Sequence, residues 1–142
     1  MMDNLAAAAQ RVAGASLPTI SALVSKSLVR RKPDERYTMY ELLRHYAEIE
    51  LEAAGQTAAA CSAHCTYYAD LLEQCATKIA RGRSTAVMQE LAADLANLQS
   101  ARQWALAHYD AAAAARFLAA LAALYETPCC SQVEMELLLP GA

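Results

Sequence analysis

The chain has few residues that interrupt helices, with four glycines and four prolines among 142 residues. Large aromatic side chains are also scarce, since one Phe and one Trp accompany seven Tyr. Hydrophobic residues still make up 56% of the chain, and alanine supplies much of that share. Alanine has the highest helix propensity because ordering it costs no side-chain entropy. The composition therefore predicts a mainly α protein whose long helices pack through small side chains.

No run of the sequence is long and apolar enough to predict a membrane span. The most apolar stretch, "AAAAARFLAALAALY" at residues 111–125, contains Arg116 and is shorter than the roughly 20 residues that a bilayer requires. The N-terminus, "MMDNLAAAAQRV", lacks the basic segment of a secretory signal. The cysteines are an odd number, which favours free thiols in a reducing compartment. We expect a cytoplasmic protein with no membrane partner.

Charge is unevenly distributed along a chain whose formal net charge is −3. Residues 1–45 carry seven basic and four acidic residues, whereas residues 46–142 carry five basic and eleven acidic ones. The basic set that could contact an anion, DNA or a neighbouring domain is Lys26, Arg30, Arg31, Lys32 and Arg36. The preceding segment, Leu17 to Ser25, offers no Arg, Asn or Gln to read base edges. We therefore favour an acidic neighbouring domain as the partner, with DNA as the alternative.

Two short helices are predicted near the N-terminus. The first covers residues 3–13, with Asp3 as its N-cap and Gly14 as its stop. The second covers residues 16–27, with Ser16 as the capping residue and Pro18 tolerated in the first turn. Both apolar faces are narrow, so neither helix would be stable alone.

A β-hairpin is predicted next, from β-compatible segments at residues 28–31 and 36–39. They flank Lys32-Pro33-Asp34, a turn sequence in which proline presets φ and aspartate tolerates turn geometry. The order helix, helix, strand, turn, strand is the minimal order of a winged helix.

A strand is then expected to pass into a helix without a loop. Thr38 and Glu41 have the spacing of a capping box, in which each side chain satisfies a backbone N–H of the other residue. An apolar stripe follows in "ELLRHYAEIEL", and Gly55 marks either the end of this helix or a kink.

Longer helices are predicted over residues 57–81, 85–109 and 111–126. In the first, one face carries Cys61, Cys65, Tyr68, Leu72, Cys75 and Ile79. Asp110 is a suitable N-cap after a tight turn, so the second and third helices are expected to form an αα-hairpin. Trp104 is expected to fill a core gap or a seam between repeats. A tail at 127–142 begins at Pro128 and could start a further helix near Gln132.

Residues 23–51, "LVSKSLVRRKPDERYTMYELLRHYAEIEL", resemble the winged-helix end of STAND-type signalling ATPases, the NB-ARC-like class. That class includes large bacterial transcriptional regulators of the MalT/LuxR type and plant disease-resistance proteins. The downstream segments "AHCTYYADLLE" and "ELAADLANLQSARQWALAHYDAAAAARFLAAL" resemble the start of its helical-repeat region, which is similar to tetratricopeptide (TPR) repeats. The resemblance covers about residues 5–125.

The resemblance implies a truncated winged helix at 1–45, linker helices with a TPR-like hairpin at 46–126, and a tail or further repeat at 127–142. The phosphate-binding loop of the family, GxxxxGK[ST], is absent from the sequence, as is a Walker-B strand ending in Asp. We therefore expect no cofactor and no ATP hydrolysis by this chain. The implied function is that of a non-catalytic regulatory module, which couples a helical-repeat sensor to the nucleotide-binding core of an ATPase transcriptional regulator.

The nucleotide-sensor motif of the family corresponds to Met39, Tyr40 and Glu41. Relatives carry at the middle position a histidine that senses the phosphate of bound ADP, and Tyr40 cannot replace an imidazole there. The motif is therefore degenerate, and its remaining role would be to lock the junction between strand and helix.

Other functions were weighed against these residues. A zinc site at Cys61, His64, Cys65 and Cys75 would need ligands from elsewhere, because Cys75 lies about 15 Å along the same helix. No protease signature surrounds any cysteine, and His45 and His108 lack a partner pattern. The main alternative is a stand-alone winged-helix DNA-binding regulator with a helical dimerisation region. We also expect self-association, through residues 85–126 or through Leu137, Leu138 and Leu139 in the tail.

Overall fold

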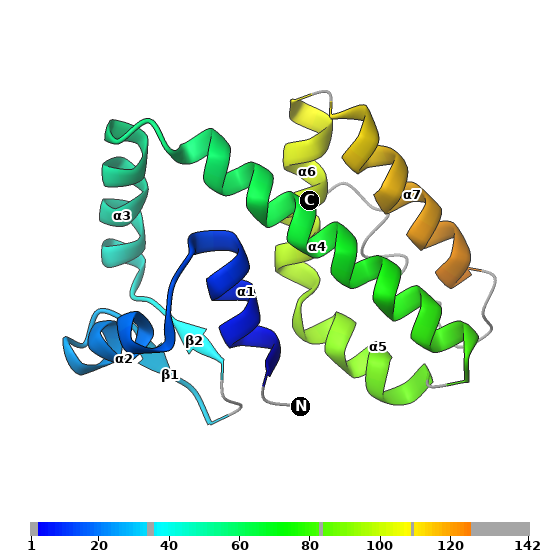
Figure 1. Cartoon of the computed structure of the whole chain (residues 1–142), viewed down its shortest axis with the longest axis horizontal. Coiled ribbons are helices and arrows are strands. Elements are labelled where there is room, and N and C mark those ends of the chain that lie inside the picture. Colours follow the sequence, from blue (N-terminus) through cyan, green and yellow to red (C-terminus); the bar gives the residue numbers. More distant parts are fainter. Residues whose placement is uncertain (1–2, 34–35, 83, 109, 126–142) are drawn as a thin grey trace. The chain divides into compact units, whose positions relative to one another are not determined.

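The structure is a computed structural model that describes residues 3–33, 36–82, 84–108 and 110–125 (Figure 1). The chain divides into two compact units, Met1–Ala63 and His64–Ala142, and the boundary falls inside helix α4 (Thr57–Ala80). The described residues are mainly helical with one small antiparallel hairpin, which confirms the predicted mainly α class. The finer domain limits at residues 45 and 126 stay a prediction.

The first helix, α1 (Asp3–Ala13), ends as the sequence predicts. Gly14 has φ +63°, and its N–H donates to the carbonyl of Gln10 at 2.9 Å. Such a left-handed residue closes a helix and satisfies its last carbonyl groups, and glycine adopts it without steric cost. Asp3 is the first residue of the helix rather than the residue before it.

The second helix, α2 (Leu17–Ser25), begins with the predicted cap. The Ser16 hydroxyl accepts a hydrogen bond from the Thr19 N–H at 3.3 Å, and Pro18 lies in the first turn. Two residues after the last residue of the helix, Ser27 is left-handed with φ +58° although it is not glycine. The next N–H, that of Leu28, donates to the Leu23 carbonyl at 3.0 Å.

The predicted hairpin is present but short. Strands β1 (Arg30–Arg31) and β2 (Tyr37–Thr38) are antiparallel, with Arg30 opposite Thr38 and Arg31 opposite Tyr37. Beyond the strands, the Lys32 N–H donates to the Arg36 carbonyl at 2.7 Å and closes the turn.

The predicted capping box at Thr38 and Glu41 is wrong. Thr38 belongs to β2, and the backbone stays extended through Tyr40 at φ −62° and ψ 144°. Helix α3 (Glu41–Ala53) therefore begins two residues later than a cap at Thr38 would require, and Tyr40 makes no side-chain cap hydrogen bond. Strand pairing with Arg30 takes Thr38 away from the helix. At the other end Gly55, with φ +66°, terminates α3.

The long helix α4 was predicted almost to the residue. Its buried side chains include five of the six predicted for one face, while Cys61 is half-buried. These five are Cys65, Tyr68, Leu72, Cys75 and Ile79. At about 1.5 Å per residue, its 24 residues extend about 36 Å.

The prediction of one continuous helix over residues 85–109 is wrong. The segment forms α5 (Ser84–Ala93) and α6 (Leu95–Ala107), which are separated at Asp94. Asp94 is buried, and its carboxylate accepts a hydrogen bond from the Asn97 amide at 3.3 Å. Aspartate side chains compete with the backbone for hydrogen bonds and so disfavour helix interiors. The predicted apolar positions remain buried on both sides of the break, except Leu95, which is half-buried.

The predicted αα-hairpin is confirmed. Helix α7 (Ala111–Tyr125) packs against α6, and the Asp110 carboxylate accepts the Ala113 N–H at 3.0 Å as an N-cap. Trp104 on α6 is half-buried rather than part of the core, and it stacks on His108 with ring centroids 4.5 Å apart.

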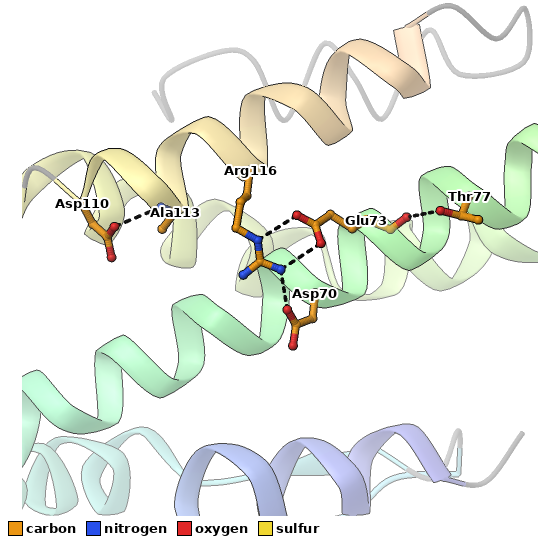
Figure 2. Close-up of polar contacts among 6 residues, drawn as sticks. All are labelled: Asp70, Glu73, Thr77, Asp110, Ala113 and Arg116. Carbon is orange, nitrogen blue, oxygen red and sulfur yellow. Dashed lines mark hydrogen bonds and ion pairs between the residues drawn. The ribbon is translucent and has the colours of Figure 1, made fainter.

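Charged side chains join the helices of the second unit (Figure 2). The Arg116 guanidinium on α7 donates two hydrogen bonds of 2.8 Å to the Glu73 carboxylate and a further one to Asp70, both on α4. Lys78 on α4 and Glu90 on α5 form an ion pair at 3.6 Å. Because Arg116 holds two carboxylates, it fixes α7 against α4.

None of the helices in the described ranges combines the length with the apolar character that crossing a bilayer needs. The predicted tail at 127–142, with Cys129, Cys130 and Leu137–Leu139, lies outside the described residues.

Candidate protein-docking groove

The first unit contains an open apolar groove of about 500 Å³. One wall is helix α3, which contributes Leu43, Tyr46 and Leu51, and the other includes Leu23 from the end of α2. Met39, from the junction between β2 and α3, also lines it. Almost all of the exposed lining is apolar, so the groove suits the side chains of another polypeptide better than a charged small molecule.

Helix α3 exposes more apolar surface than the groove alone accounts for. None of its residues is buried, and the exposed fractions of Leu42, Tyr46 and Ile49 are 85%, 61% and 50%. These positions, spaced by four and three residues, lie along one side of the helix. Contiguous apolar surface with this periodicity is typical of a helix that docks on a protein.

The same helix carries charges of both signs in its first half, where Glu41 accompanies Arg44 and His45. Its second half is acidic, with Glu48, Glu50 and Glu52. The Arg44 guanidinium donates to the carboxylates of Glu41 and Glu48, the second at 3.2 Å. Arg44 lowers the pKa of the Glu41 carboxyl, chiefly through this hydrogen bond.

The predicted sensor motif lies at the junction between strand and helix, but its three residues make different contacts. Met39 lines the groove, while Glu41 is the first residue of α3 and binds Arg44. Tyr40 is half exposed, and the Arg30 guanidinium lies over its ring, 4.9 Å from the centroid. A cation over an aromatic face is attractive by about 0.5–1 kcal/mol at exposed sites. Tyr40 therefore links the hairpin to the start of α3.

The predicted basic set is spread over the hairpin and its flanks. Arg30 and Arg31 form β1, Lys32 follows it, Lys26 caps the end of α2, and Arg36 precedes β2. All of them are exposed except Arg36, which is half-buried. Of the five, Arg30 is held over the Tyr40 ring, and a joint anion site stays a prediction.

Two features of this region escaped the sequence reasoning. The contact between Arg30 and Tyr40 was accessible in principle, because a hairpin that pairs Arg30 with Thr38 places Tyr40 at the diagonal position. The groove was not accessible, because it depends on which faces of α2 and α3 approach each other.

The candidate zinc ligands were Cys61, His64, Cys65 and Cys75. Within the described residues, no three side chains among His, Cys, Asp and Glu are grouped so that they could hold a metal ion. Burial raises the pKa of the Cys75 thiol to about 11 and also raises that of Cys65. Such thiols remain protonated near neutral pH and are poor nucleophiles. Burial likewise lowers the pKa of His64, whose ring lies 4.7 Å from that of Tyr68.

Comparison of the chain with protein-family models, curated proteins and solved structures finds no match. Its function is therefore inferred from its own residues.

Proposed function

We propose that this chain is a non-catalytic protein-interaction module of a STAND-type ATPase transcriptional regulator. The observation that supports it best is the uncovered apolar surface of α3 and the adjoining groove, which together resemble half of a protein–protein interface. In this role the winged-helix-like first unit would contact a nucleotide-binding core, and the TPR-like helices of the second unit would bind the effector.

The contact between Arg30 and Tyr40 gives this module a mechanical link. A displacement of the hairpin by the core would pull on the first residue of α3 through the Tyr40 ring. The chain then continues through the turn at Gly55 into α4, which belongs to both compact units. Ligand binding at the repeats could bias the hairpin only through such differential contacts.

In this proposal another domain hydrolyses ATP, which is consistent with the lack of a phosphate-loop motif in the sequence. A direct test uses a purified ATPase core that is encoded in the same reading frame or by a neighbouring gene. We expect the chain to bind this core in isothermal titration calorimetry and to change its rate of ATP hydrolysis. Tyr40→Ala should weaken that change more than Tyr37→Ala, its matched control in the same hairpin. The proposal is contradicted if the ATPase core binds the chain no more tightly than bovine serum albumin binds it.

A stand-alone DNA-binding regulator is the second candidate, supported by the exposed basic side chains of the hairpin. Helix α2 argues against it, because its side chains are apolar or carry only hydroxyl groups. We expect no retardation of a mixed-sequence duplex at 50 mM salt, where phosphate contacts are strongest. Retardation that weakens steeply with salt and disappears in the Arg30→Ala, Arg31→Ala double variant would favour the regulator instead.

A further inference from the structure

We draw no further inference here: the strongest candidate, the exposed face of α7 with Leu118 and the alanines beside it, is an uncharged stripe of mostly small side chains, and nothing in the part of the chain that the structure describes shows what covers it.

Discussion

The two compact units differ in how far their apolar side chains are buried. Among residues 8–63 of the described chain, Ile20 is the one buried hydrophobic side chain, whereas α3 leaves Leu42, Tyr46 and Ile49 half exposed or more. In the second unit Leu72, Leu91, Leu98 and Leu124 are almost completely buried, joined by aromatic side chains and buried alanines. The second unit thus has a core of its own, whereas the described part of the first unit leaves its largest apolar side chains exposed.

The difference comes from helix length and pairing. The second unit joins α4 to α7 through Arg116 and packs α6 on α7, so each helix covers the apolar face of another. The first unit has two short helices, a hairpin of two-residue strands, α3 and the start of α4, and these elements leave the apolar face of α3 exposed. A small unit of this kind buries a small fraction of its surface and is marginally stable alone.

The largest test of this comparison is a leucine truncation in each unit. Leu98→Ala should destabilise the second unit by about 3 kcal/mol, because it leaves a cavity in a closed core. Leu42→Ala, at an 85% exposed position, should change the free energy of unfolding by less than about 0.5 kcal/mol. Urea denaturation with native-state hydrogen exchange measures both. Similar losses from the two truncations would remove the contrast between the units.

Helix caps provide the next test. Asp110→Ala should cost about 1 kcal/mol in the unfolding of the second unit, because the Ala113 N–H loses its partner. Asp110→Asn, which keeps an acceptor, should recover most of that loss. Ser16→Ala removes the equivalent cap of α2 and should speed exchange of α2 amides without affecting amides of α6 and α7. Slower unfolding of the Asp110→Ala protein than of the wild type would be incompatible with this account.

A smaller effect concerns pH and the ion pairs of Arg116. Its hydrogen bonds lower the pKa of the Glu73 carboxyl in the folded state, so the stabilisation is present above the ordinary pKa and is lost as pH falls through the lowered one. Since these side chains are partly exposed, we expect Arg116→Met to cost about 0.5–1 kcal/mol at pH 7. The difference in the free energy of unfolding between the variant and the wild type should become smaller by pH 3. A difference that grows on acidification would contradict this role of Arg116.

The smallest expected effect is a gain of stability in the first unit. Ser27 pays the steric cost of a left-handed conformation, which glycine avoids, although glycine loses more backbone entropy on folding. Ser27→Gly should therefore stabilise the first unit by a few tenths of a kcal/mol. Ser21→Gly, inside α2, should destabilise it. Hydrogen exchange of α2 amides reports the change in stability of both variants. If both glycine substitutions stabilise the unit, or both destabilise it, Ser27 does not carry a steric cost that glycine relieves.

Local sequence rules predicted the parts of the fold that local chemistry controls. Gly14, Gly55 and Asp110 end or cap helices as expected, because each acts on neighbouring backbone groups alone. The same rules failed at Thr38, where pairing with the other strand overrides a capping box, and at Asp94, where an aspartate inside an apolar helical pattern separates two helices. The junction at Tyr40 could be located from the sequence, but the groove beside it arises from the approach of separate elements. The link to regulatory ATPases stays a prediction.

Arg116 has a consequence that follows from its alanine-rich helix. Much of the surface of α7 is alanine, and the large side chains that set its packing against its neighbours are Phe117, Leu121 and Leu124. The planar guanidinium grips Glu73 with two parallel hydrogen bonds, and rotation by even one residue would break both. A single cation thus adds a directional constraint to the packing of these few large side chains, and both favour the same rotational setting of α7.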